Sequence, residues 1–190
     1  MMTKILSPGY TQRGALELLL HTDATLELLD IDEVYYPYIW IRYRIQAGKG
    51  RFVKKQLRFC DCIVDRVSGS TYEAKGEPDF SEIEIDEDES LDVSVLVNEC
   101  YDIAHDFVLK QYIGKEKLIF APEMMIDDEE QFYKKFYIVT CREKQGFNYY
   151  IMVDAVDGGI SILDHEKHIE NLVRDGELEE AERVLDSIER

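Results

Sequence analysis

Aromatic and cationic residues recur at every second position between Tyr38 and Arg44. In a β-strand, residues with this spacing share one face. Trp and Arg often anchor protein partners, and faces of this kind also bind single-stranded nucleic acid through stacking and phosphate contacts. We therefore predict a partner-binding surface made of Tyr38, Trp40, Arg42, Arg44, Lys54 and Arg58. The alternative is that Trp40 is covered by the C-terminal helices or by the second half of the chain, which would make the patch partly core.

The charge distribution bears on the partner of this surface. The net charge of −18 repels phosphate backbones, so direct nucleic-acid binding is not expected. Residues 34–60 hold seven basic side chains and no acid, whereas residues 77–109 hold twelve acids and no Lys or Arg. Two interpretations stay open: the two segments neutralise each other within or between subunits, or the basic patch receives an acidic partner.

Two cysteines and two histidines are spaced so that each pair could contribute ligands to a metal site. Cys60 and Cys62 share one face of a strand, and His165 and His168 lie one helical turn apart. A zinc site at the two thiols would need ligands from elsewhere in the chain, such as Cys100, His105 or Cys141. The CxxC spacing of zinc knuckles is absent. We therefore predict buried free thiols, a solvated helix start at the histidines, and no metal site.

The carboxylates and nucleophiles show no catalytic pattern. Asp65 and Asp154 each begin an Asp-to-Gly segment typical of a tight turn, in which Asp accepts backbone hydrogen bonds and Gly adopts positive φ. Cys100 and His105 are five residues apart, which places them on different faces of one helix. The sequence contains no glycine-rich phosphate loop, GxSxG elbow, HExxH or EF-hand pattern. We predict no catalytic residue and no cofactor.

A repeated pattern positions these side chains. The similar stretches are Ile39–Tyr43 with Ile63–Gly69, and Tyr137–Cys141 with Met152–Gly158. The two turn aspartates are offset by 89 residues. Each copy follows an apolar helix, expected at about residues 11–29 and 91–112. This arrangement indicates duplication of one helix-plus-hairpin unit.

In the first copy, alternation predicts which face meets the preceding helix. The inward set of the first strand is Ile39, Ile41, Tyr43 and Ile45. On the return strand the inward set is Val53, Leu57, Phe59 and Ile63, with Lys55 and Asp61 as misfits. The outward set of the return strand is then Lys54, Gln56, Arg58, Cys60 and Cys62. Basic side chains of both strands are therefore expected on the face of Trp40.

The chain is expected to divide into two tandem related units. The first α+β unit is expected at residues 1–76, an acidic linker at 77–90, and the second α+β unit at 91–163. Residues 164–190 predict a C-terminal helical hairpin, with helices at His165–Arg174 and Glu177–Glu189. The predicted fold class is α+β, with two helix-plus-antiparallel-sheet units followed by this hairpin.

The second unit resembles a PepSY-like domain. The resemblance rests on an amphipathic helix, the strand Phe136–Val139, a hairpin and the ending Val153–Gly158. The first unit looks like a more diverged copy that ends in Val64–Gly69. The resemblance implies a cystatin-like sheet wrapped on a helix and a non-catalytic role in binding or inhibiting another protein. It carries over no functional residue.

The hydropathy of the chain bears on its localisation. No stretch reaches the roughly 20 apolar residues of a membrane span, and the first residues are broken too soon for a signal peptide. We therefore expect a cytoplasmic protein with no membrane partner. We predict a non-enzymatic protein-binding or regulatory module, compatible with a homodimer. Two alternatives stay open: an acidic nucleic-acid mimic that occupies a basic protein, and a small-molecule binder or enzyme that uses a sheet–helix groove.

Overall fold

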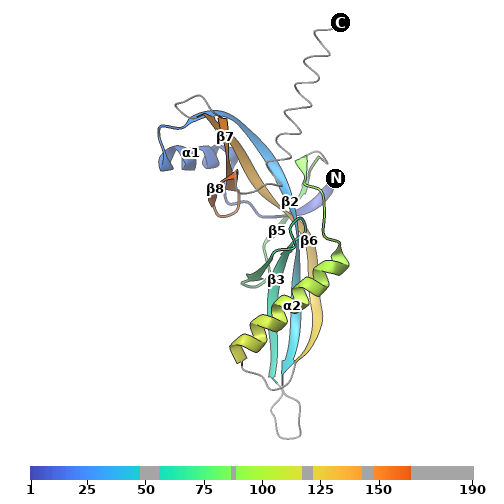
Figure 1. Cartoon of the computed structure of the whole chain (residues 1–190). Helices are drawn as coiled ribbons and strands as arrows, with labels where there is room; N and C mark the ends of the chain where they lie inside the picture. Colours follow the sequence, from blue (N-terminus) through green and yellow to red (C-terminus); the bar gives the residue numbers. More distant parts are fainter. Residues whose placement is uncertain (48–55, 87–88, 117–121, 143–147, 164–190) are drawn as a thin grey trace, which may run out of the picture. The chain divides into compact units, whose positions relative to one another are not determined.

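The computed structural model describes residues 1–47, 56–86, 89–116, 122–142 and 148–163. The elements in chain order are β1 (Met2–Leu6), α1 (Gln12–Thr22), β2 (Glu27–Ala47), β3 (Gln56–Asp65), β4 (Thr71–Ala74), β5 (Phe80–Glu84), α2 (Val97–Glu116), β6 (Glu123–Arg142), β7 (Asn148–Asp154) and β8 (Ile160–Ile162) (Figure 1). Of the described residues, 54% lie in strands and 21% in helices. The described part of the chain is therefore mostly β-sheet, and the predicted α+β class of two tandem helix-plus-sheet units is wrong. The hairpin expected at residues 164–190 lies outside the described residues.

The chain forms two compact units, and neither is one continuous segment. Unit 1 comprises Met1–Ser7 and Tyr36–Lys134, and unit 2 comprises Pro8–Tyr35 and the residues from Lys135 onward. The long strands β2 and β6 each contribute residues to both units. The structure thus divides the chain at other places than the boundaries expected at residues 76 and 91. The expected acidic linker contains β5, which pairs with β1.

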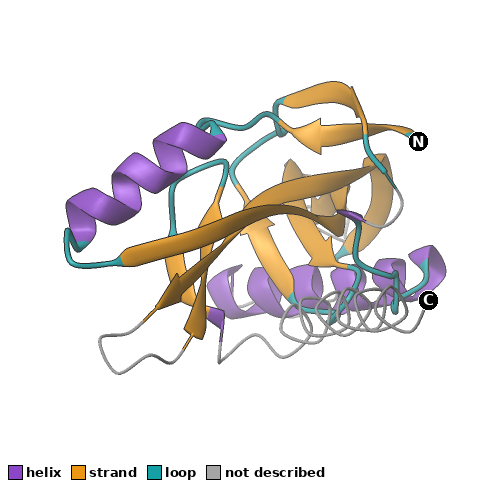
Figure 2. Cartoon of the chain, turned by 90° about the horizontal axis from the view of Figure 1, so that it is seen from above, coloured by secondary structure: helices purple, strands orange, loops and turns teal. Residues whose placement is uncertain are grey.

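Unit 1 is a mixed sheet with a helix on one face. Its strand order is β4-β3-β2-β6-β1-β5, in which β1 is parallel to β6 and antiparallel to β5. The helix α2 lies along one side of these strands (Figures 1 and 2). The core between them consists of Ile39, Ile41, Tyr43, Ile45, Cys62, Val64, Cys100, Ala104 and Val108. The predicted inward face of the first strand is thus buried against a helix, but that helix is α2.

The return strand β3 faces the opposite way from the prediction. Its register places Cys62 opposite Ile41, and directly opposite residues share a face of the sheet. Cys62 is therefore buried against α2, whereas Leu57 and Phe59 are 58% and 54% exposed on the other face. The pattern favoured inward positions for the bulkier apolar side chains. Asp61, one of the two misfits of that set, forms an ion pair with Arg42 on the face opposite α2.

Unit 2 has the strand order β8-β7-β6, with α1 packed on one face. The helix begins after Thr11, whose hydroxyl oxygen accepts a hydrogen bond from the Gly14 N–H (3.2 Å). This contact satisfies one of the donors that a helix N-terminus leaves without a partner. The core consists of Ala15, Leu19, Tyr137, Val139, Cys141, Ile151, Val153 and Ala155.

Each helix therefore packs on the hairpin of the other repeat copy and not on the hairpin that follows it in the chain. The helix α1 precedes the first hairpin but packs on β6 and β7, and α2 packs on β2 and β3. The prediction that each hairpin packs on the helix before it is wrong. Both helices present an apolar stripe and both hairpins present an apolar face, so periodicity alone does not say which pairs meet.

The ends of the helices also differ from the prediction. The helices expected at residues 11–29 and 91–112 are Gln12–Thr22 and Val97–Glu116. After α1 the chain enters the long strand β2 at Glu27. The sequence pattern extends the predicted helix over apolar residues of the early part of β2, because a short apolar run is compatible with either element.

The two turn aspartates occupy equivalent positions in the two units. The backbone N–H of Asp65 and that of Asp154 each donate to the carbonyl oxygen five residues later, at 2.8 Å. One carboxylate oxygen of each residue accepts a hydrogen bond from the backbone N–H two residues later, at 2.7 and 2.8 Å. Gly69 and Gly158 both have a φ of +75°, which favours glycine. The interpretation of both segments as tight turns is confirmed.

Candidate functional site

Four predicted site residues share the face of the unit 1 sheet that lies opposite α2. On β2 they alternate with the core residues, and they are Tyr38, Trp40, Arg42 and Arg44. The register adds the β3 residues Leu57, Phe59, Asp61 and Ile63 to this face. We call this side of β2 and β3 the arginine face. Arg58 stands opposite Ile45 and therefore lies on the α2 side, contrary to the prediction. Lys54 lies outside the described residues.

Trp40 belongs to the framework of the arginine face. Its side chain is 2% exposed, and the guanidinium carbon of Arg42 lies 5.0 Å from the centre of its ring. The indole Nε1 is buried and has no hydrogen-bond partner among the described residues. The alternative that the patch is partly core therefore applies to this residue. Trp40 can support binding by shaping the surface, but it offers little area for direct contact.

The two arginines are paired with acids of unit 1. Arg42 Nε lies 2.7 Å from Asp61 Oδ1, and Arg42 Nη1 lies 3.6 Å from Glu77 Oε2. The hydrogen bond to Asp61 raises the pKa of Arg42 above its ordinary value. Arg44 Nε lies 3.5 Å from Asp127 Oδ1. At Arg42 and Arg44 the positive charge of the basic hairpin is therefore neutralised within the chain. Of the three acids, Glu77 belongs to the acidic run of residues 77–109, whereas Asp61 and Asp127 lie outside it.

Exposed apolar side chains gather at one end of the arginine face. Leu57, Phe59 and Met125 are 58%, 54% and 59% exposed. Leu57 and Met125 line a hollow of about 400 Å³ whose other lining residues are Arg44, Gln46 and Glu123. Phe59 belongs to the same face, since it stands opposite Arg44 in the register. We call Leu57, Phe59 and Met125 the apolar end.

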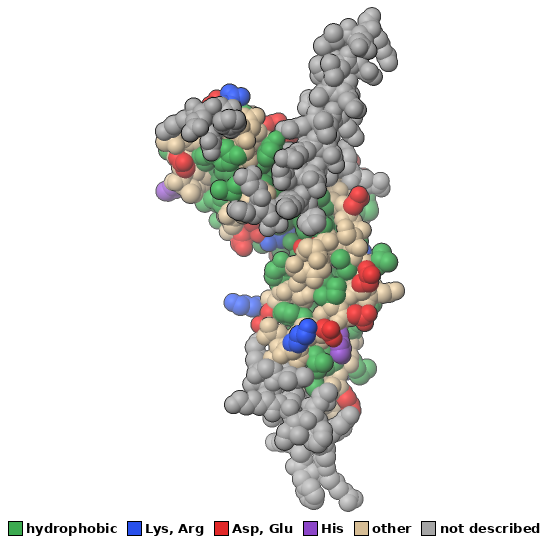
Figure 3. All heavy atoms as spheres, in the orientation of Figure 1, with side chains coloured by type: hydrophobic (Ala, Val, Ile, Leu, Met, Phe, Trp, Pro, Cys, Tyr) green, Lys and Arg blue, Asp and Glu red, His purple; other side chains and the backbone are tan. Residues whose placement is uncertain are grey.

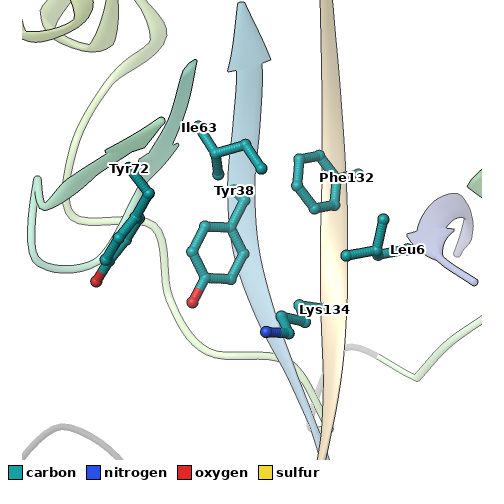
Figure 4. A pocket seen from close by; sticks show the side chains of 6 residues that line it. All are labelled: Leu6, Tyr38, Ile63, Tyr72, Phe132 and Lys134. Atoms are coloured by element: carbon teal, nitrogen blue, oxygen red, sulfur yellow. The ribbon is translucent and has the colours of Figure 1, made fainter. Parts of the chain in front are cut away.

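A second hollow involves other residues of the same face (Figure 4). Its volume is about 340 Å³, and its lining residues are Leu6, Tyr38, Ile63, Tyr72, Phe132 and Lys134. We call it the aromatic hollow. Of these residues, the sequence predicts only Tyr38 as part of a site. The others come from β1, β3, β4 and β6, so the strand order of the folded sheet is what brings them together.

The described residues offer little for metal or thiol chemistry. No group of three or more His, Cys, Asp or Glu side chains within them could hold a metal ion. Cys60 is partly buried, Cys62, Cys100 and Cys141 are buried, and none of the four is in a disulfide. Burial raises the pKa of Cys62 to about 12, so this side chain stays protonated at neutral pH and is a poor nucleophile.

The exposed side of α2 carries acids that are interspersed with other side chains. Glu99, Asp102 and Asp106 are exposed along this helix. In the view of Figure 3, acidic side chains over this part of unit 1 are separated by apolar and uncharged ones. On this face the acids therefore do not gather into one continuous patch.

Comparison with protein-family models, with curated proteins and with solved structures found no match for the chain. The resemblance to PepSY-like domains stays a prediction. Within the described residues, neither helix is long and apolar enough to cross a membrane. The geometry of the arginine face is therefore the basis on which a function can be proposed.

Proposed function

We propose that this chain is a non-enzymatic protein-binding or regulatory module whose partner contacts the apolar end of the arginine face. The observation that carries the proposal is the exposure of three large apolar side chains on one side of a sheet: Leu57, Phe59 and Met125. Larger exposed apolar patches on soluble proteins often mark interaction sites. Aromatic, Met and Arg side chains are also enriched where proteins meet.

The internal ion pairs define the chemistry of this partner. Arg42 and Arg44 already contact acids of the same unit, so an acidic partner would have to compete with those contacts. An apolar partner surface would leave the ion pairs intact. Burying an exposed Leu, Met or Phe side chain contributes about 1.5–3 kcal/mol. We therefore propose apolar contacts as the main source of affinity, with Arg44 at the rim.

A pair of matched substitutions tests the proposal. Phe59→Ser and Leu96→Ser each remove a large apolar side chain, 54% and 64% exposed respectively, but Leu96 lies just before α2 and outside the arginine face. Affinity capture from the source cells, quantified by mass spectrometry, should recover the partner about tenfold less with Phe59→Ser and normally with Leu96→Ser. Both variants should keep the melting temperature within about 2 °C of the wild type. Undiminished recovery with Phe59→Ser, or equal loss in both variants, would contradict the proposal.

Light scattering on the purified chain decides whether the partner is a second copy. A dimer that becomes monomeric in Phe59→Ser but not in Leu96→Ser would identify the apolar end as a homodimer interface. A wild-type monomer would assign the surface to a different protein. A dimer that survives Phe59→Ser would show that self-association uses another part of the chain.

A further inference from the structure

The aromatic hollow has ring walls that are fixed by contacts within unit 1. The rings of Tyr38 and Phe132 are stacked, with centroids 5.7 Å apart and an interplanar angle of 20°. Phe80 supports Phe132 from β5 at a centroid distance of 5.0 Å. Tyr72 stands on the other side of Tyr38 (Figure 4) and is 52% exposed. Two walls are thus held by packing, and the third, Tyr72, is exposed to solvent.

The polar atoms of the hollow are separated from its apolar side chains. In Figure 4 the hydroxyl groups of Tyr38 and Tyr72 point in the same direction, and the amine of Lys134 lies on that side. Leu6, Ile63 and Phe132 supply the apolar remainder. Lys134 is the one charged residue among the six that line the hollow. It also interacts within the protein, so a ligand would share its ammonium group with that contact.

These features select a class of ligand. The volume of about 340 Å³ falls in the range of small-molecule sites, which are mostly apolar with a few polar groups that fix orientation. Aromatic walls favour a flat ring by offset or edge contacts. A lysine and two phenol groups at one side favour a negatively charged oxygen, because all three can donate hydrogen bonds to it. We infer that the aromatic hollow binds a small aromatic carboxylic acid, with the ring among Tyr38, Tyr72 and Phe132 and the carboxylate toward Lys134.

This inference goes beyond the proposed function and is independent of it. The apolar end consists of residues that do not line the aromatic hollow. Loss of partner capture in Phe59→Ser therefore leaves the ligand site intact, and failure of ligand binding leaves the protein-binding proposal standing.

The test uses the purified full chain and naphthalene carboxylate as the probe, with binding measured by isothermal titration calorimetry. We expect saturable binding with a dissociation constant of about 1 mM or lower, and binding about tenfold weaker for naphthylmethylammonium, which has the same ring and the opposite charge. No saturable binding up to about 5 mM probe, or equal affinity for the two compounds, would overturn the inference.

Four variants locate the site. Lys134→Met and Tyr72→Ala should each weaken binding of the carboxylate about five- to tenfold, because they remove the charge and one ring wall. Lys134→Arg should retain most of the affinity. Lys110→Met removes the same charge from the exposed surface of α2 and should change nothing. Melting temperatures establish that each variant is folded. Unchanged affinity in both Lys134→Met and Tyr72→Ala, or loss of affinity in Phe59→Ser, would place the probe elsewhere and refute the assignment.

Discussion

Replacing Leu19 with alanine tests whether α1 packs on the second hairpin. Leu19 is 1% exposed and belongs to the core that contains Tyr137, Val139 and Val153. The order of the elements along the chain predicts instead that Leu19 packs against the first strand, around Ile39. The substitution leaves a cavity at whichever hairpin the helix covers, so its effects report the packing partner directly.

The size of the effect follows from the burial. Leu-to-Ala changes in protein cores cost about 2–5 kcal/mol, depending on how far the surroundings collapse into the cavity. Leu19 lies on a helix of 11 residues, and partial collapse of so short an element into the cavity would recover some of this cost, so we expect a value near the middle of that range, about 3 kcal/mol. For a chain of this size that corresponds to a melting temperature lower by about 6–12 °C.

The assay combines urea unfolding with backbone amide chemical shifts. Leu19→Ala should perturb amides of β6 and β7 between residues 135 and 155 most strongly. The matched change Val108→Ala, at a fully buried position of α2, should perturb residues 39–45 and 60–64 and cost about 2 kcal/mol. Strong shifts in residues 39–45 from Leu19→Ala, with residues 135–155 unaffected, would refute the exchanged packing.

Four further predictions concern the turns and the thiols. Gly158→Ala should lower the free energy of unfolding by about 2 kcal/mol more than Gly76→Ala in urea titrations. Both glycines have a positive φ, but a Cβ at Gly158 would lie 2.9 Å from a tyrosine ring, whereas a Cβ at Gly76 would meet nothing within 4 Å. Equal costs would contradict the close approach. Asp65→Asn should cost about 2–3 kcal/mol in the same assay, because the carboxylate accepts two backbone and two side-chain hydrogen bonds that an amide cannot accept in full; a cost below about 0.5 kcal/mol would refute this role. A thiol reagent at about pH 8 should label Cys60 faster than Cys62, whose pKa of about 12 lies above the ordinary value of about 8.5. Since this pKa is raised by folding, the stability it contributes is present below about pH 8.5 and is lost as pH rises toward 12, which a lower urea midpoint at about pH 10.5 would show.

Features that depend only on residues close together in the sequence were predictable. The alternation from Ile39 to Ile45 identified the buried face of β2, because successive side chains of a strand point to opposite sides whatever packs on them. The turns at Asp65 and Asp154 were also predictable, since their hydrogen bonds join residues two to five positions apart.

The candidate site was predictable only within one strand. Tyr38, Trp40, Arg42 and Arg44 share a face because they alternate on β2. The position of Arg58 was wrong, because the face of a return strand depends on its register, and a shift of one residue moves every side chain to the other side. The exposure of Leu57 and Phe59 follows from the same register.

The long-range pairing of the elements was decided by tertiary structure alone. Two helices with apolar stripes and two hairpins with apolar faces can pair in either combination, because the hydrophobic effect rewards burial without regard to direction or chain order. The observed combination joins α1 to β6 and β7, and α2 to β2 and β3. The aromatic hollow also depends on the tertiary structure. Leu6, Tyr72 and Phe132 come together only in the folded sheet, whose strand order aligns β1, β4 and β6 around a common face. Local patterning therefore determined which side chains each strand presents, and the folded sheet determined which of them act together.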